Sequence, residues 1–147
     1  PVLVEEKAYL TDSAGPGRHR GGFGQRVLFR KRDDDGQTML VSVYPEGVNN
    51  PIPGLFGGQP GLGARGRVLD GAGNVLIDCG TGQLVELTHP DQRVEMVLAG
   101  GAGYGPAADR DPAEVARDLA LGLITPEHAA QHYGLAPVTA PAADPVA

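Results

Sequence analysis

Short apolar runs, separated by turns rich in glycine, proline and aspartate, follow one another up to about residue 98 and predict β-strands. Residues 2–4 and 7–10 indicate a first strand, and residues 26–32 and 39–44 indicate two more. The turn Asp34-Asp35-Gly36 lies between these two, and Asp and Gly tolerate the positive φ of tight turns. We therefore expect them to form a hairpin.

Two further strand pairs are expected in the same part of the chain. Residues 66–69 and 74–78 flank the turn Asp70-Gly71-Ala72-Gly73, which is a clearer hairpin signal than the first. Residues 84–87 and 93–98 are the candidates for a third pair. The pattern up to this point is therefore mainly β.

Residues 49–63 combine repeated proline and glycine with a few large apolar side chains. Proline pushes the residue before it towards extended backbone, and a Pro/Gly repeat favours polyproline II over a helix or a β-ladder. The amides of such a segment need partners in neighbouring segments or in water. Leu55, Phe56 and Leu62 indicate a segment pinned to the core, and the alternative is an ordinary exposed loop.

Helix signals begin near the C-terminal end of the chain. Asp111 is a good N-cap, Pro112 suits the first helical position, and Glu114 has the spacing of a capping box. Gly122 is expected to end this helix, because glycine readily adopts the left-handed conformation of helix ends. Val115 and Leu119 lie at positions i and i+4, on one face of this predicted helix.

A second, shorter helix is expected over residues 127–133. Thr125 is its expected cap, Pro126 opens it, and Gly134 ends it. Residues 136–147 are rich in proline and alanine and carry no core-forming pattern, so we expect them to be a flexible tail. The two helices together predict a short C-terminal helical hairpin.

The composition fits one modest domain. The chain has 147 residues, of which 41% are hydrophobic, and its 23 glycines and 13 prolines approach the level of low-complexity sequence. The apolar runs between the glycines argue against disorder. We expect residues 1–135 to form one α+β domain that is mainly β, with glycine-rich polyproline-II-like segments and a short C-terminal helical hairpin.

Charge and cysteine content argue against several classes of protein. A net charge of −6 argues against nucleic acid as the main partner. No run is long and apolar enough to cross a bilayer and no signal peptide opens the chain, so we expect no membrane partner. The single cysteine, Cys79, forms no internal disulfide, and the cytoplasm is the expected location.

Basic side chains gather early in the chain, whereas its C-terminal part is acidic. The basic residues are Arg18, His19, Arg20, Arg26, Arg30, Lys31 and Arg32, with a smaller pair at Arg65 and Arg67. The acidic residues are Asp109, Asp111, Glu114, Asp118 and Glu127. Two interpretations stay open: a basic patch that meets an acidic face of a partner subunit, or charges that decorate strand edges and a helix surface.

Several patterns have the spacing of a site without its context. Residues 61–66 match the dinucleotide pattern Gly-x-Gly-x-x-Gly, but a coil precedes them and a strand follows, so we expect no cofactor there. His128 and His132 share a helix face without a following carboxylate, so we expect no metal site. Cys79 is expected to be a small buried residue, and residues 33–35 a hairpin tip rather than a cation site.

The run from Asp12 to Gln25 holds the candidates for direct chemistry, Arg18, His19 and Arg20. Its many glycines indicate backbone that passes close to a neighbouring segment. An Arg fork beside exposed backbone N–H groups can bind a phosphate or a carboxylate. Alternatively, Arg20 ties buried carbonyl groups of the glycine coil, and we favour this structural role.

The same run resembles the Asp-Ser-Gly-Gly-x-Gly-x-x-Arg-Gly-Gly-x-Gly signature of the hydantoinase B family, although Ala14 stands where Gly is usual. Residues 53–61 resemble the family's Gly-Gly-x-Pro-Gly segment. Residues 99–106 resemble its Gly-Gly-Gly-Gly-Tyr-Gly-x-Pro motif, with Ala102 in place of one glycine. The similarity continues in family order over residues 110–134, and the motifs are specific in combination.

The resemblance implies a B-type subunit of an ATP-dependent hydantoinase, 5-oxoprolinase or ketone carboxylase. Such a subunit pairs with an A-type subunit that binds ATP and Mg²⁺ and activates an amide or a ketone through a phosphorylated intermediate. Hydantoin, N-methylhydantoin or 5-oxoproline is then hydrolysed, or a ketone such as acetone or acetophenone is carboxylated. The implied fold has barrel-like sheets that run into glycine-rich polyproline II segments.

The resemblance covers only the C-terminal part of such a subunit. It implies that any divalent metal and most active-site residues belong to the N-terminal remainder, so we expect no turnover from this chain alone. Two classes of function stay open. The chain is a domain that contributes to a composite active site, or a non-catalytic module that docks the B subunit to its partner.

Overall fold

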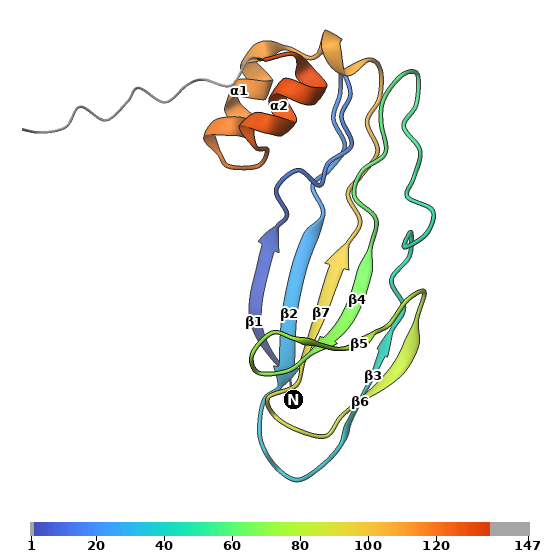
Figure 1. Cartoon of the computed structure of the whole chain (residues 1–147), viewed down its shortest axis with the longest axis vertical. Coiled ribbons are helices and arrows are strands. Elements are labelled where there is room, and N and C mark those ends of the chain that lie inside the picture. Colours follow the sequence, from blue (N-terminus) through green and yellow to red (C-terminus); the bar gives the residue numbers. More distant parts are fainter. Residues whose placement is uncertain (1, 136–147) are drawn as a thin grey trace, which may run out of the picture.

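The computed structural model describes residues 2–135; Pro1 and residues 136–147, which include the expected tail, lie outside the described part. The strands are β1 (Val2–Tyr9), β2 (Gln25–Lys31), β3 (Met39–Val43), β4 (Arg65–Leu69), β5 (Val75–Asp78), β6 (Gln83–Leu87) and β7 (Arg93–Leu98). The helices are the 3-10 helix η1 (Ala107–Asp109), α1 (Pro112–Ala120) and α2 (Pro126–Tyr133). Figure 1 shows an elongated molecule with the sheets at one end and the helices at the other, which confirms a mainly β protein of the α+β class.

The strands form a five-stranded sheet in the order β1-β2-β7-β4-β5 and a two-stranded sheet of β3 and β6. All the pairs are antiparallel. The hairpin of β4 and β5 is confirmed, and its turn is closed by the Asp70 N–H, which donates to the carbonyl of Asn74 at 2.9 Å. The described strands form open sheets and no closed barrel, because β1 and β5 lie at opposite edges and do not pair.

Two of the expected strand pairs are wrong. Strand β2 pairs with β1 and β7 rather than with β3, and β6 pairs with β3 rather than with β7. The turn at residues 33–35 therefore connects two different sheets and is not a hairpin tip. The physical reason is burial: β3 and β6 both bury alternate residues, and together they cover one face of the larger sheet.

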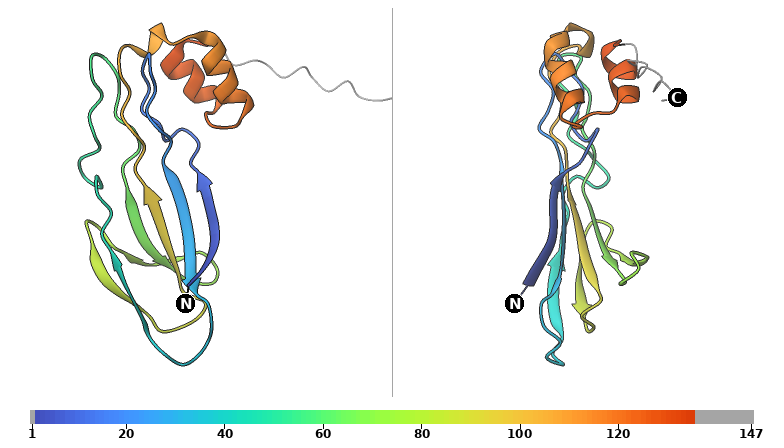
Figure 2. Two further views of the ribbon diagram at one scale, coloured as in Figure 1. Left: turned by 180° about the vertical axis from the view of Figure 1, so that it is seen from behind. Right: turned by 90° about the vertical axis from the view of Figure 1, so that its left-hand side faces the viewer.

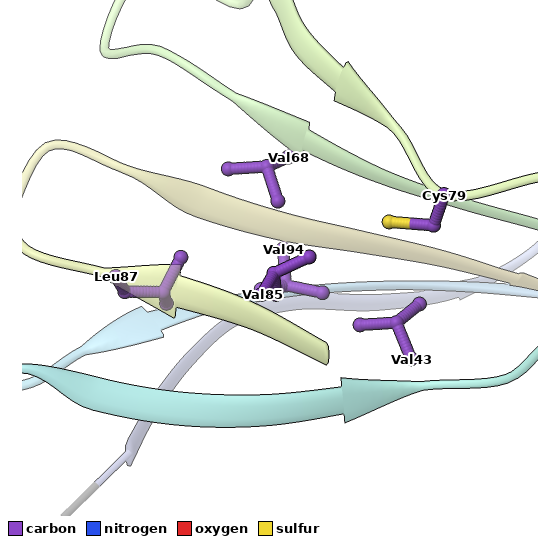
Figure 3. Close-up of a cluster of buried hydrophobic side chains, with 6 residues drawn as sticks. All are labelled: Val43, Val68, Cys79, Val85, Leu87 and Val94. Atoms are coloured by element: carbon purple, nitrogen blue, oxygen red, sulfur yellow. The ribbon is translucent and has the colours of Figure 1, made fainter. Parts of the chain in front are cut away.

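The main core lies between the two sheets, as Figure 3 shows. Its buried side chains are Val43, Val68, Cys79, Val85, Leu87 and Val94. Cys79 is therefore the small buried residue that its sequence context predicts. The alternate residues of β2, β4 and β7 point away from this core and include Arg26, Arg65 and Glu95, so the other face of the sheet is charged.

Three glycine-rich segments, residues 13–24, 54–63 and 99–105, run side by side from the sheets towards the helices, and we call them the glycine bundle (Figures 1 and 2). Backbone hydrogen bonds join them, among them Gly103 N–H to the carbonyl of Gln59 at 2.8 Å. A Cβ atom on Gly100 would overlap the carbonyl oxygen of Ser13. The segments thus pack too closely for side chains between them, and their polyproline II conformation stays a prediction.

The expectation that apolar side chains pin residues 49–63 to a core is wrong. Leu55, Phe56 and Leu62 have exposed fractions of 57%, 76% and 46%. The segment is held by its backbone instead: Leu62 N–H donates to the carbonyl of Ser13 at 2.9 Å, and Leu55 N–H to that of Gly103 at 3.0 Å. Hydrogen bonds between backbone groups, rather than burial of side chains, therefore hold this part of the chain in place.

The two helices have the expected caps. The Asp111 carboxylate accepts the N–H of Ala113 at 2.9 Å, and the Thr125 hydroxyl accepts the N–H of His128 at 3.1 Å. Gly134 ends α2 with a φ of 69°. A second, small core forms between the helices from Val115, Ile124 and Ala129, so the helical hairpin folds onto itself as well as onto the glycine bundle.

Candidate functional site

The end of the glycine bundle nearest the helices, which we call the tip, brings together Arg18, His19, Leu55, Phe56 and Tyr104. Tyr104 is its centre, because it forms isolated β-bridges with His19 on one side and Leu55 on the other. The N–H of His19 donates to the carbonyl of Tyr104 at 3.0 Å, and the N–H of Tyr104 donates back at 2.9 Å. The backbone of the tip is therefore fixed although its side chains face outwards.

Arg18 and His19 are exposed, and within residues 2–135 their side chains form neither an ion pair nor a hydrogen bond. They line a pocket of about 390 Å³ whose remaining walls are Asp109, Arg110, Asp111 and Glu114. The pocket thus combines cationic and anionic groups. It suits a ligand or side chain that carries both charges better than it suits a simple anion.

Arg20 differs from Arg18 and His19, because its side chain has hydrogen-bond partners within the fold. Its Nε and Nη2 donate to the two carboxylate oxygens of Asp118 at 2.7 and 3.2 Å, and its Nη1 donates to the carbonyl of Gly21 at 3.0 Å. Arg110 Nη2 donates to the same Asp118 carboxylate at 3.0 Å. We call Arg20, Arg110 and Asp118 the Asp118 clamp; it ties α1 to the glycine bundle and supports the structural interpretation of Arg20.

Aromatic rings complete the clamp. The Arg20 guanidinium lies 4.2 Å from the centroid of Phe23, and that of Arg110 lies 5.9 Å from the centroid of Tyr133. Burial raises the pKa of the Tyr133 hydroxyl above its ordinary value. The Nε of Arg110 is buried without a hydrogen-bond partner within the described residues. The clamp is thus a largely buried cluster in which one buried carboxylate, that of Asp118, holds both arginines, while Glu114 adds a longer ion pair to Arg110 at 3.8 Å.

Asp12 and Asp118 are structural residues that sequence reasoning missed. The Asp12 carboxylate accepts the N–H of Thr125 at 2.7 Å and its hydroxyl at 2.9 Å, and it thereby fixes the start of α2. Asp12 has a φ of 61°, a conformation that aspartate tolerates better than most residues. No local signal predicts either contact, because each joins residues about a hundred positions apart.

The other early basic residues are neutralised within the chain. Their ion-pair partners are Glu6 and Glu95 for Arg26, Glu5 for Arg30, Asp35 for Lys31, Asp33 for Arg32, Glu95 for Arg65 and Asp78 for Arg67. Glu95 is buried and bridges two strands through Arg26 at 2.8 Å. This pattern favours charges that decorate the sheet over a basic patch reserved for a partner.

The remaining sequence patterns lie apart from the tip. Residues 61–66 lead into strand β4 rather than into a helix, and a Cβ on Gly61 would lie 2.6 Å from the carbonyl oxygens of Gly100 and Gly101, so Gly61 packs against the neighbouring segment. The rings of His128 and His132 are 4.4 Å apart. Within the described residues, no three His, Cys, Asp or Glu side chains are placed to hold a metal ion. No helix in this part of the chain has the length and apolar character needed to cross a bilayer.

Residues 1–107 match the family described as Hydantoinase B/oxoprolinase. The chain belongs to this family. It is 32% identical over 141 residues to the caprolactamase subunit beta of Pseudomonas jessenii, a match that covers 92% of this chain and 23% of that protein. It is 29% identical over 161 residues to the acetophenone carboxylase delta subunit of Aromatoleum aromaticum, with 90% of this chain and 23% of that protein covered.

Two solved structures have the same fold. The ATP-dependent caprolactamase of Pseudomonas jessenii matches with a TM-score of 0.71 at 26% identity, over 92% of this chain and 23% of that one. Nucleotide-free acetone carboxylase matches with a TM-score of 0.63 at 22% identity, over 91% of this chain and 21% of that one, which shows the fold alone. The chain spans less than a quarter of the length of each of these relatives.

Proposed function

We propose that this chain is the C-terminal domain of the B-type subunit of an ATP-dependent enzyme that hydrolyses cyclic amides such as hydantoin, N-methylhydantoin, 5-oxoproline or a lactam. The observation that carries the proposal is the family match over residues 1–107, together with the identity to a caprolactamase subunit. An A-type partner subunit binds ATP and Mg²⁺, and any further divalent metal belongs to the N-terminal remainder of the B subunit. The complex is cytoplasmic.

In this proposal the isolated chain has no turnover. Arg20 is held in the Asp118 clamp, and residues 61–66 lead into a strand rather than into a helix N-terminus, so neither offers a catalytic group. Arg18 and His19 are the exposed side chains of the candidate run that keep no partner within the described residues. They are therefore the groups through which this domain reaches a composite site.

A ketone carboxylase is the second candidate, because the acetophenone carboxylase delta subunit is nearly as similar to this chain as the caprolactamase subunit is. The complete complex with ATP distinguishes the two. Hydrolysis of caprolactam, hydantoin or 5-oxoproline with release of ADP is expected. Bicarbonate-dependent consumption of acetone or acetophenone, without amide hydrolysis, would contradict the amidohydrolase assignment.

A pair of variants in the same complex separates a composite site from an assembly module. We expect the double substitution Arg18→Ala and His19→Ala to reduce kcat while gel filtration shows a normal complex. Arg117→Ala is the matched control, because Arg117 is an exposed arginine of α1 outside the tip. Normal turnover in the double variant would exclude these residues from the site, and a lost complex would support the assembly module.

A further inference from the structure

Phe56 is the most exposed of the large apolar side chains within the described residues, with an exposed fraction of 76%. Its φ is 50°, in the left-handed region that bulky residues rarely adopt. It lies at a tight turn closed by the N–H of Gly58, which donates to the carbonyl of Leu55 at 2.9 Å. Glycine or asparagine would form this turn with less strain, so the turn itself gives no reason for a phenylalanine.

The exposed ring is part of a larger apolar surface. The centroids of Phe56 and Tyr104 are 5.1 Å apart, and Tyr104 and Leu55 are themselves 49% and 57% exposed. The bridges of Tyr104 to His19 and Leu55 fix the backbone that carries this surface. Aromatic side chains on a fixed backbone lose little backbone entropy on binding, which is the property of an interface anchor.

The charges around these rings define the chemistry of a partner. His19 forms a β-bridge with Tyr104, and Arg18 precedes it; both are exposed and form no ion pair within residues 2–135. The pocket that they line also carries the exposed carboxylates of Asp109, Asp111 and Glu114. An apolar centre whose rim carries both an arginine and carboxylates is complementary to an apolar pocket edged by groups of both charges. We propose that the tip is a docking knob, with Phe56 and Tyr104 filling such a pocket on the part of the family subunit that lies outside this chain.

The choice of occupant rests on length and on the proposed function, in which this chain is one domain of a longer subunit. The relatives devote only 23% of their length to the matched region, so most of such a subunit lies beyond it. A surface on the same polypeptide binds without a second loss of translational freedom and at a high effective concentration. A pocket on the same polypeptide is therefore favoured over a pocket on a separate subunit as the binding site of the tip.

Photo-crosslinking in the complete subunit, purified with its partner, tests the proposal. The crosslinker p-benzoylphenylalanine replaces Phe56 in one variant and Tyr104 in a second, which keeps the test valid if the first does not fold. Both are expected to crosslink to one segment of the same subunit outside the present 147 residues, as peptide mapping would show. Crosslinks to the partner subunit, to a second copy, or to nothing would overturn the proposal.

A charge reversal tests whether Arg18 meets a carboxylate of the docking surface. Arg18→Glu in the crosslinking background is expected to abolish most of the product, whereas Arg117→Glu on the exposed face of α1 leaves the yield unchanged. Equal yields from the two variants would contradict a contact between Arg18 and a carboxylate of the docking surface. Formation of the crosslink needs no turnover, so the two proposals can fail separately. A crosslink within the subunit, in a complex that has neither amidase nor carboxylase activity, would refute the proposed function and retain the docking knob.

Discussion

Replacing Asp118 with alanine removes the carboxylate that binds both arginines of the Asp118 clamp. This carboxylate accepts three hydrogen bonds from two arginines, at 2.7 and 3.2 Å from Arg20 and at 3.0 Å from Arg110. Its side chain is 5% exposed and that of Arg110 is 6% exposed, so the substitution removes the buried counter-charge of a buried guanidinium. The other carboxylate near Arg110 is that of Glu114, which is 55% exposed and 3.8 Å away. We therefore expect the helices to loosen from the glycine bundle.

The expected loss follows from the burial of the two arginines. Breaking a buried ion pair from one side costs about 3–5 kcal/mol. Arg20 is 25% exposed and regains hydration, whereas Arg110 does not, so we expect the lower end, about 3 kcal/mol. Asp118→Asn keeps the shape and one acceptor oxygen, so its expected cost is smaller, about 1–2 kcal/mol.

Urea unfolding followed by circular dichroism measures this loss. With a slope of about 2 kcal/mol per molar urea, the midpoint of Asp118→Ala is expected to fall by about 1.5 M. Hydrogen exchange locates the effect, which we expect in α1 and α2 first. Asp109→Asn is the matched control, because Asp109 is an exposed acid of the same region, and its effect should stay within about 0.5 kcal/mol. An Asp118→Ala chain as stable as this control would refute the reasoning.

Further predictions concern packing, pH and thiol chemistry. Gly100→Ala is expected to lower the free energy of unfolding by about 3 kcal/mol, because its Cβ would overlap the carbonyl oxygen of Ser13. Gly22→Ala is the control, since the space around its Cβ is open, and its thermal unfolding should be nearly unchanged. Burial lowers the pKa of His128 from its ordinary 6.5, so the unfolded chain binds a proton at a higher pH than the folded chain does. The free energy of unfolding should therefore fall as the pH drops below about 6.5. His128→Gln should flatten this decline, as urea unfolding at several pH values would show. Burial raises the pKa of the Cys79 thiol, so a disulfide reagent should react with it slowly until urea is added, and fast labelling of the folded chain would contradict its burial.

Features that depend on neighbouring residues could be predicted from the sequence. Asp111 and Thr125 cap their helices as expected, and the Asp70 turn closes the hairpin of β4 and β5. In each case the side chain and the backbone group that it satisfies lie within a few positions. The glycine-rich motifs also predicted the family, since their order and spacing are specific even though each motif is weak.

Strand partners and the exposure of the loops could not be predicted in this way. A turn at residues 33–35 is compatible with a hairpin, but β3 pairs with β6 instead, and together these strands bury Val43, Val85 and Leu87 against the larger sheet. Leu55 and Phe56 are apolar and yet exposed, because hydrogen bonds between backbones, not side-chain burial, hold their segment. Periodicity reports which residues are apolar, not which neighbours the fold provides.

The glycine run at residues 12–25 shows both what the sequence determines by itself and what depends on the tertiary structure. Its composition alone indicated close backbone packing, since only glycine permits segments to approach within the radius of a methyl group. The roles of its basic residues depended on contacts across the fold: Arg20 meets Asp118 from 98 positions away, whereas Arg18 and His19 meet no such partner within the described residues. Turns, helix caps and close backbone packing depend on adjacent residues and can be predicted from the sequence. Which charges pair depends on the path of the chain in three dimensions.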